Sequence, residues 1–441
     1  MDSVPLGRGR AYPIHLSLPP FALSTWSIFK FGGASVKDPE ALRNAVRLVR
    51  AYGTHPLLVV VSAMGKTTNA LERYIQAREL GDTAAAAVEL DGIKAFHGQM
   101  ARDLGLLDAE LQAQLNALWA AAERVDSLQA YNPRYDAVVS LGELASSRIL
   151  AAALKADGQD AAWLDAREVL ATDAVYRRAT VDWVQTAART AAALAQPAAV
   201  TVTQGFIGAA PDGSTTTLGR EGSDYSAAIF ANVLKASSLS IWKDVPGMLS
   251  GDPKVFPSVV RLEQVPYREA IELAFYGASI IHPKTIQPLE QGETTLRIRS
   301  FVDPDAPGTE VGPFAALTPE VPCWIRHENQ VLIEVSSRDL SFLSEGHLSE
   351  VYRIFAEEGL LVRAAQHTAL STRFAVNDDR VAVPLALERL NSPYRTTAEY
   401  GLRLTTVSRP DAESLATLLA VGPLRMMLRN HEVAQVLTAP N

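Results

Sequence analysis

The stretch from Leu218 to Ala231 has residue types that could bind an anion. It opens with glycines and small polar residues and then continues into an Ala, Ile and Phe pattern that predicts a helix. The free N–H groups and the positive dipole end of a helix start suit an anion. Arg220 adds a guanidinium that fits a carboxylate or a phosphate, and Asp224 adds a first-turn carboxylate. A helix that is merely capped by Ser223 explains the same residues, so other parts of the chain must decide.

A second candidate anion site lies near the start of the chain. Ser27–Phe31 is predicted to be a short strand, followed by Gly32 and Gly33 and by a helix that begins at Pro39. A strand, a glycine loop and a helix in this order are typical of a nucleotide-phosphate site, although two glycines alone are a weak signal. Lys30 adds information, because a lysine in a buried strand is costly unless it meets an anion.

The next predicted strand, Leu57–Val61, is continuously apolar, as expected for a buried parallel strand. It leads into a loop rich in hydroxyl groups that contains Ser62 and Thr68. A Gly-Lys-Thr sequence in this loop imitates a P-loop, but that motif requires a glycine five residues before Gly65, where the chain has Val60. We therefore reject a P-loop and keep a polar loop at the end of a strand.

Charged side chains follow two further predicted strands. Ala137–Glu143 is predicted to be a strand that turns into a helix, so Glu143 could hold a substrate ammonium group or simply favour a helix dipole. A later strand ends in Lys243 and Asp244, and Lys254 follows a Pro-Gly turn. Basic and acidic residues together at a strand end suit phosphates with a bound Mg²⁺, and an exposed turn is the alternative.

Strands and helices alternate up to about residue 300, and this order predicts an α/β fold with a mainly parallel sheet sandwiched by helices. Ligands bind at the carboxyl ends of such strands, where the loops described above fall. From Val331 the pattern changes to a smaller α+β unit, and its second half is predicted to be an abbreviated repeat. We expect an N-terminal extension over residues 1–26, a catalytic domain over 27–312 and a regulatory or dimerisation region over 318–441.

The composition argues against several classes of protein. A formal net charge of −8 disfavours a nucleic-acid binder, because phosphate contacts need a basic face. No apolar run approaches the ~20 residues of a membrane span, and the proline-containing N-terminus does not match a secretory signal. Cys323 is the only cysteine, so we expect a reducing compartment, the cytoplasm.

Five motifs in this chain, in the same order, resemble those of the aspartate kinases in the amino-acid kinase superfamily. The resemblance extends from about residue 27 to residue 300 and continues more weakly through an ACT-like C-terminal region. The motifs are Lys30–Val36, Val61–Thr68, Gly219–Asp224, Trp242–Gly247 with Asp252–Lys254, and Phe275–Pro283.

The resemblance implies ATP-dependent phosphorylation of the side-chain carboxylate of L-aspartate, the first step towards lysine, threonine and methionine, with Mg²⁺ present. It implies catalytic roles for Lys30 and Asp224 and names no protein ligand of a metal. It also implies a homodimer or higher homo-oligomer and an amino-acid effector, lysine or threonine. Aspartate would be held by Ser62, Thr68, Glu143, Arg220 and Ser223, and ATP by Lys30, Gly32, Gly33, Lys243, Asp244 and Lys254.

Four positions depart from the commonest pattern of these kinases. Ala34 stands where threonine is usual, and Glu221 where glycine is common. Lys243 replaces a common threonine, and Ser279 stands where a nucleotide-contacting lysine is frequent. We hypothesise that Lys243 supplies the charge that is missing at Ser279. The alternatives are a related kinase with another acceptor, such as glutamate, acetylglutamate, carbamate or UMP, and a non-catalytic effector-binding homologue.

Overall fold

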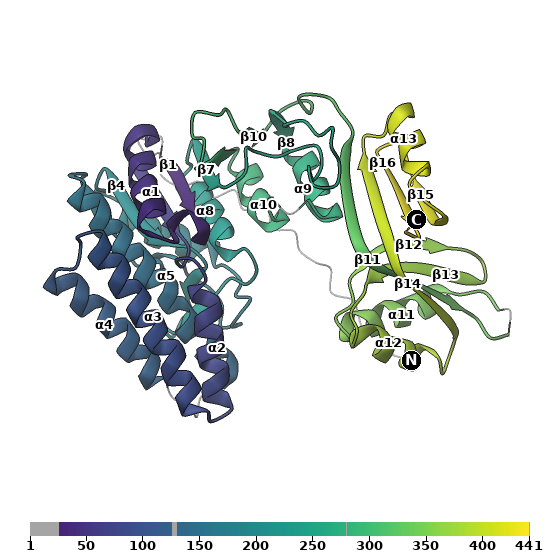
Figure 1. Cartoon of the computed structure of the whole chain (residues 1–441), viewed down its shortest axis with the longest axis horizontal. Helices are drawn as coiled ribbons and strands as arrows, with labels where there is room; N and C mark the ends of the chain where they lie inside the picture. Colours follow the sequence, from purple (N-terminus) through teal and green to yellow (C-terminus); the bar gives the residue numbers. More distant parts are fainter. Residues whose placement is uncertain (1–25, 126–129, 279, 340, 441) are drawn as a thin grey trace, which may run out of the picture.

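The computed structural model describes residues 26–125, 130–278, 280–339 and 341–440 of the 441-residue chain. These residues form two units, an N-terminal unit with a large helix-covered sheet and a smaller C-terminal unit (Figure 1). The predicted extension, apart from its last residue, and Ser279 lie outside the described residues.

The N-terminal unit is built around an eight-stranded sheet in the order β3-β4-β2-β1-β7-β9-β10-β8. Its neighbouring strands are parallel except for β9 and β10, so the predicted mainly parallel sheet is confirmed. An antiparallel pair, β5 (Ile207–Ala209) and β6 (Thr215–Thr217), lies apart from this sheet. The eight strands are β1 (Ser27–Phe31), β2 (Leu57–Val61), β3 (Ala161–Trp163), β4 (Val200–Gln204), β7 (Ser238–Lys243), β8 (Gln264–Pro266), β9 (Thr295–Ser300) and β10 (Thr309–Gly312).

Helices cover both faces of this sheet because successive strand residues point to opposite faces. In β1, Phe29 and Phe31 pack into the apolar cluster that contains residues of α1 to α5, and Ile28 packs into the cluster that contains α8 to α10. Lys30 therefore faces the side on which α8 lies. The helices are η1 (Gly33–Val36), α1 (Pro39–Tyr52), α2 (Thr67–Glu79), α3 (Thr83–Asp103), α4 (Ala109–Arg124), α5 (Tyr131–Ala156), α6 (Ala166–Val169), α7 (Trp183–Ala193), α8 (Gly222–Val233), α9 (Tyr267–Tyr276) and α10 (Pro283–Gln291).

Helix α5 corrects one prediction, because Ala137–Glu143 lies in the middle of a helix and is not a strand. A short apolar run does not distinguish a buried strand from a buried helix. By length and composition α5 could even span a membrane, but 83% of its most apolar window is buried inside the protein, as in the core helix of a soluble protein. Gly142 lets this helix pack tightly, since a Cβ there would lie 3.0 Å from the Cβ of Ala63.

The C-terminal unit contains a six-stranded sheet in the order β12-β13-β11-β14-β16-β15 with antiparallel neighbours, which confirms the predicted smaller α+β unit. Helices α11 and α12 pack with the half that contains β13, and α13 packs with the half that contains β16. The elements are β11 (Cys323–Ser336), α11 (Glu345–Glu357), β12 (Val362–His367), β13 (Ser371–Asn377), α12 (Ala382–Leu390), β14 (Arg395–Ser408), α13 (Ala412–Leu419), β15 (Leu424–Arg429) and β16 (Val433–Thr438).

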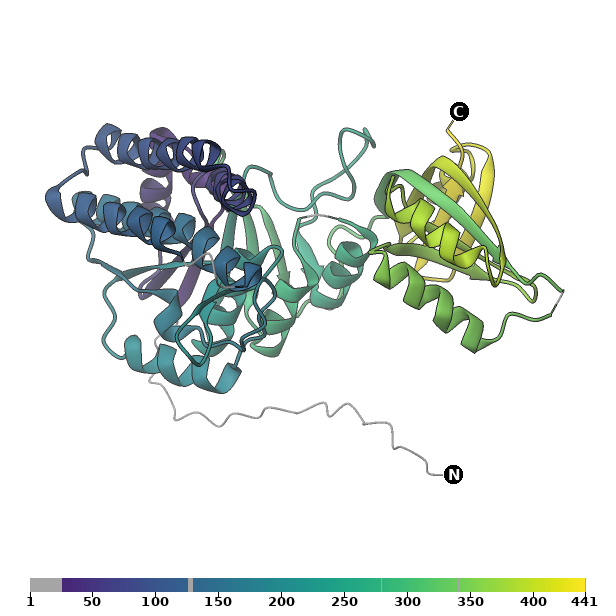
Figure 2. The same cartoon turned by 90° about the horizontal axis from the view of Figure 1, so that it is seen from below.

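The two units touch where α9 meets β11, in the narrow middle of the molecule (Figure 2). His327 Nε2 donates a hydrogen bond to the carbonyl oxygen of Tyr276 at 2.7 Å. Gly277 ends α9 with a φ of 112°, and a Cβ there would lie 2.4 Å from the His327 ring. Glycine at this turn therefore permits both the backbone conformation and the close contact with the C-terminal unit.

Candidate active site

A cavity of about 610 Å³ opens at the carboxyl ends of β1 and β2, beside the start of α8. Most of the residues predicted for the site line this cavity, although they come from five separate stretches of sequence. They are Lys30, Gly33, Ser62, Thr68, Glu143, Arg220, Ser223, Asp224 and Lys243.

Within the cavity Asp224 lies between two lysines. Lys30 Nζ is 2.6 Å from Oδ1 of Asp224, and Lys243 Nζ is 3.4 Å from Oδ2. Burial acts to raise the pKa of Asp224, but the charges of Lys30 and Lys243 outweigh it and hold the pKa below its ordinary value. Asp224 is therefore ionised at neutral pH, and it fixes two ammonium groups side by side with a net charge of one positive unit.

Lys243 also donates a hydrogen bond to the carbonyl oxygen of Ile280, in the turn between α9 and α10. Ile280 directly follows Ser279, the position at which the related kinases often carry a lysine. Because Ser279 lies outside the described residues, the hypothesis that Lys243 supplies the missing charge stays a prediction. The structure does give Lys243 two partners, the carboxylate of Asp224 and this backbone carbonyl.

No side chain caps the start of α8, so the simple interpretation of a helix capped by Ser223 is wrong. The helix begins at Gly222, and its N-cap residue, Glu221, has a left-handed φ of 54°. This conformation favours glycine, in keeping with the glycine that is common at this position in the related kinases. Ser223 lies in the first turn and lines the cavity. The N–H of Gly222 donates to the carbonyl oxygen of Gly219 at 3.0 Å, so the N–H groups that follow it in this turn can serve an anion.

Two glycines let the chain segments around the cavity approach one another closely. A Cβ on Gly33 would lie 2.7 Å from the carbonyl oxygen of Ala63, and a Cβ on Gly205 would lie 2.5 Å from the Cβ of Ser223. Gly33 brings the glycine loop against the loop after β2. Gly205 brings the end of β4 against the first turn of α8.

Glu143 reaches the cavity from the middle of α5. Its side chain is buried, and the N–H of Ala63 donates to its Oε1 at 3.4 Å. Its Oε2 is buried and has no hydrogen-bond partner among the residues that the structure describes. Burial raises the pKa of Glu143 to about 8, because the ionised form is poorly solvated. A buried carboxyl with an unused oxygen suits an ammonium ligand, whose charge would favour the ionised form.

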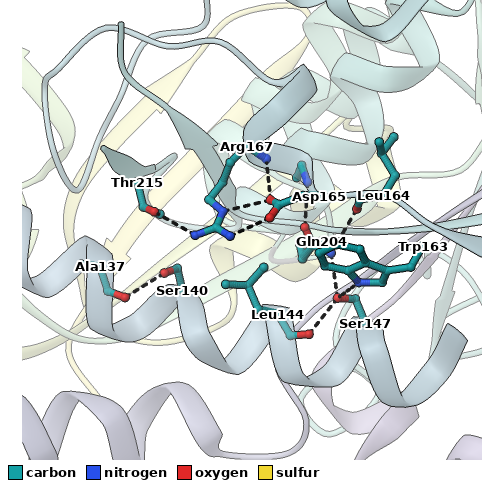
Figure 3. A network of polar contacts seen from close by, with 11 residues as sticks. Ala137, Ser140, Leu144, Ser147, Trp163, Leu164, Asp165, Arg167, Gln204 and Thr215 are labelled. Carbon is teal, nitrogen blue, oxygen red and sulfur yellow. Dashed lines mark hydrogen bonds and ion pairs between the residues drawn. The ribbon is translucent and has the colours of Figure 1, made fainter. Parts of the chain in front are cut away.

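A network of polar contacts fixes α5 against the ends of β3 and β4 (Figure 3). The side-chain amide of Gln204 donates to Ser147 Oγ at 2.7 Å, and Trp163 Nε1 donates to the same oxygen at 2.9 Å. Gln204 Oε1 accepts the N–H of Ala166 at 2.7 Å. Ser147 lies one helical turn after Glu143, so this network anchors the part of α5 that presents Glu143 to the cavity.

Three predicted residues do not line this cavity. Gly32 precedes η1, and a Cβ there would lie 3.5 Å from Lys30 Nζ, so the glycine keeps space beside that ammonium group. Asp244 and Lys254 are exposed in the loop that follows β7. Their assignment to ATP stays a prediction.

Several residues of the cavity wall were given no individual role by the sequence, although some of them lie in the predicted motifs Val61–Thr68 and Gly219–Asp224. If residues 137–143 are taken as helix, Tyr135 lies about two turns before Glu143 and on a similar side of α5. This helical spacing could have identified Tyr135 as a residue of the cavity wall. Arg177 lies in an irregular loop between α6 and α7, where neither a motif nor a periodic pattern marks it. The wall residues outside the predicted motifs are Glu72, Tyr135, Arg177, Phe206 and Thr217, and those inside them are Ala63, Gly65, Gly219, Glu221 and Gly222.

The C-terminal unit approaches this site through Arg363 of β12. Burial lowers the pKa of Arg363, and repulsion from the charge of Arg220 lowers it further. The two guanidinium groups, one from each unit, are thus close enough to influence each other. This proximity was not predicted, because the sequence does not place the two units relative to one another.

Comparison with known proteins agrees with this geometry. The model of the amino acid kinase family matches residues 25–300, and the chain belongs to that family. A curated relative, lysine-sensitive aspartokinase 3 of Escherichia coli, is 30% identical over 397 residues, which cover 86% of each chain.

Solved structures extend the similarity to both units. E. coli aspartokinase III in complex with aspartate and ADP, in its R-state, is 28% identical with a TM-score of 0.74. The T-state complex of the same enzyme with lysine and aspartate has a TM-score of 0.77. Each match covers 94% of this chain and 96% of the other. The resemblance to aspartate kinases that the motifs indicated is therefore confirmed.

Proposed function

We infer that this chain is an ATP-dependent aspartate kinase that forms 4-phospho-L-aspartate and ADP. The observation that carries this conclusion is the group of buried Lys30 and Asp224 with partly exposed Lys243, in the same cavity as Glu143. Such a site offers cations for phosphates and a buried carboxyl for an α-ammonium group. The similar E. coli enzyme has been solved with aspartate and ADP, which are one substrate and one product of this reaction.

The chemistry needs no general base, because the nucleophile is the substrate carboxylate, with a reference pKa of about 3.9. A carboxylate oxygen attacks the γ-phosphorus, the bond from that phosphorus to the β–γ bridging oxygen breaks, and ADP departs with the electron pair. The obstacle is repulsion between an anion and a polyanion. Catalysis must therefore come from positioning and from cations that offset the charge of the transferred group.

We propose the following roles for the residues of the cavity. Lys30 and Lys243, held by Asp224, offset charge on the phosphates, and Gly33 leaves room for the backbone to approach them. Glu143 binds the α-ammonium group of aspartate, and Arg220 binds its α-carboxylate. The hydroxyl groups of Ser62, Thr68 and Ser223 complete the acceptor pocket, and Gly32, Asp244 and Lys254 lie towards the nucleotide.

We propose that Mg²⁺ enters the site with ATP. Among the described residues, no group of three or more His, Cys, Asp or Glu side chains could hold a metal ion. Both oxygens of Asp224 already lie within 3.4 Å of lysine ammonium groups. The described cavity residues thus offer few free carboxylate ligands, which fits the usual binding of Mg²⁺ through substrate phosphates and one or two protein carboxylates. When bound to the phosphates, Mg²⁺ would reduce their negative charge.

Assembly and regulation are further proposals. The similar E. coli enzyme is lysine-sensitive and was solved with lysine, so lysine is the first effector to test, with threonine second. We also propose a homodimer or higher homo-oligomer formed through the ACT-like C-terminal unit. A cytoplasmic location is our proposal from the single cysteine, Cys323, which is a buried free thiol.

A coupled assay of ADP release tests the proposed function. Purified protein is given ATP and Mg²⁺ with L-aspartate, with L-glutamate, or with no acceptor. Release that depends on L-aspartate supports an aspartate kinase, and release with L-glutamate alone would support another acceptor specificity. Equal rates in all three mixtures would contradict a role in amino-acid phosphorylation.

A further inference from the structure

Arg177 projects into the active-site cavity from the loop between α6 and α7. Its backbone has a left-handed φ of 67°, which is costly for a residue other than glycine. Its guanidinium lies over the ring of Tyr135, with 4.4 Å from Cζ to the ring centroid. The residue is exposed, so its fixed backbone and the ring of Tyr135 set the direction of the guanidinium.

The buried carboxylate of Asp136, on α5, holds the backbone of Arg177. Its Oδ2 accepts the N–H of Arg177 at 2.9 Å and the N–H of Thr217 at 2.8 Å, and its Oδ1 accepts the Thr217 hydroxyl at 2.8 Å. Thr217 ends β6 and lies three residues before Arg220. One buried carboxylate therefore fixes two loops, each of which carries an arginine of the cavity wall.

The two loops also contact each other directly. The N–H of Ala179 donates to the carbonyl oxygen of Thr217 at 2.9 Å. Gly219 has a φ of 77°, and a Cβ on it would lie 3.0 Å from the carbonyl oxygen of Arg177, so glycine is favoured where the loops meet. The cavity thus has two groups of cations, the lysines gathered on Asp224 and the arginines on these adjoining loops.

The arginines differ from the lysines in what they can bind. In the described part of the chain, the ion pairs include Lys30 and Lys243 with Asp224 but none with Arg177 or Arg220. A carboxylate has about four acceptor sites, enough for two guanidinium groups at once. Since the reacting carboxylate must face the phosphates, the arginines are left for the carboxylate of aspartate that does not react.

We propose that Arg177 is a second ligand of the acceptor's α-carboxylate, acting together with Arg220, and that Asp136 is the positioning residue for both. This proposal rests on the proposed function, because it names the group of L-aspartate that the site recognises. It makes the α-carboxylate a strict requirement for a good substrate. A guanidinium pre-positioned on an aromatic ring loses little freedom when it binds.

Steady-state kinetics of Arg177→Met tests the proposal, with Arg178→Met as the matched control from the same loop. Arg178 is exposed, as Arg177 is, but it does not line the cavity. We expect the KM for L-aspartate to rise by about 10- to 100-fold in Arg177→Met, with the KM for ATP within about twofold of wild type. Arg178→Met should match wild type. Arg177→Gly should show the same loss while relieving the backbone strain, which separates binding from folding.

A substrate analogue gives the sharper comparison. L-Isoasparagine carries a carboxamide in place of the α-carboxylate and keeps the reacting side chain. The KM of wild type for L-isoasparagine should be much higher than its KM for L-aspartate. Arg177→Met should have a KM for L-isoasparagine within about twofold of wild type, because this analogue lacks the α-carboxylate that Arg177 would bind. Asp136→Asn should likewise raise the KM for L-aspartate more than the KM for L-isoasparagine. A penalty of equal size with both substrates would overturn the proposal.

The outcomes also separate this proposal from the proposed function. If wild type releases no ADP with L-aspartate, the proposed function fails. The role of Arg177 is then decided by calorimetric titration of L-aspartate into wild type and into Arg177→Met. Weaker binding by the variant supports the role. Equal affinity of the two proteins, in binding or in kinetics, refutes it.

Discussion

We expect the binding of L-aspartate to release a proton from Glu143. Burial raises the pKa of this carboxyl to about 8, so at pH 7 roughly nine-tenths of the free protein carries the proton. An ammonium group placed against Oε2 favours the ionised carboxylate and expels that proton. Below about pH 8 the affinity for L-aspartate should therefore rise with pH, by up to roughly tenfold per pH unit.

Calorimetric titration in buffers of different ionisation enthalpy measures this proton directly. We expect about 0.9 proton released per L-aspartate bound at pH 7, and a value near zero about two pH units higher. Glu143→Gln keeps the shape of the side chain and can accept the N–H of Ala63, but it has no proton to lose. This variant should bind L-aspartate more weakly, and its observed binding enthalpy should not depend on the buffer. A wild-type titration without buffer dependence, or a variant that behaves like wild type, would refute the reasoning.

The same carboxyl should affect stability with a defined sign. Its pKa rises from 4.5 to about 8 on folding, so the folded state holds the proton more tightly. The free energy of unfolding should therefore fall as the pH rises between these two values. At about 1.36 kcal/mol per pH unit the full effect is roughly 5 kcal/mol. Urea denaturation should show the loss in wild type and not in Glu143→Gln; parallel pH curves for the two proteins would contradict it.

Three further substitutions test other parts of the cavity. Lys30→Ala should lower kcat at least about 100-fold, with a smaller change in the KM for L-aspartate. The substitution removes a cation that Asp224 holds and that we propose acts on the phosphates. Near-normal turnover in the ADP-release assay would exclude that role. Lys243→Thr should raise the KM for ATP, and unchanged kinetics would rule out Lys243 as a replacement for the missing lysine. Gly205→Ala should lower the free energy of unfolding by about 1–3 kcal/mol, because its Cβ would collide with Ser223. Urea denaturation measures this loss, and wild-type stability would show that α8 can shift.

The strands that end at the cavity could be predicted because each combines a short apolar run with a loop of special composition. β1 and β2 are fully buried, and glycines or hydroxyl residues follow them. Parallel strands bring their carboxyl ends to one edge, so Lys30 and Ser62 could be grouped without coordinates. Arg220 follows β6, outside that sheet, and was linked to them by the anion-binding pattern of the helix start beside it. Asp224 could be placed with them from its position in the first turn of the next helix.

The rest depended on information that local pattern does not hold. Helix α5 is buried almost all round, so its residues lack the polar face that marks a surface helix, and the apolar pattern of Ala137–Glu143 also fits a strand. Arg177 owes its place to the hydrogen bond that Asp136 accepts from it across the fold. The proximity of Arg363 and Arg220 depends on how two separate units pack, which no single stretch of sequence records.

Two carbonyl groups at the ends of the connection between α9 and α10 contact different parts of the molecule. At one end, the carbonyl oxygen of Tyr276 is held by His327 of β11, and at the other end the carbonyl oxygen of Ile280 is held by Lys243. Cutting the chain before β11 would remove His327 and leave the carbonyl oxygen of Tyr276, at the end of α9, without this donor, although no residue of the cavity had been altered.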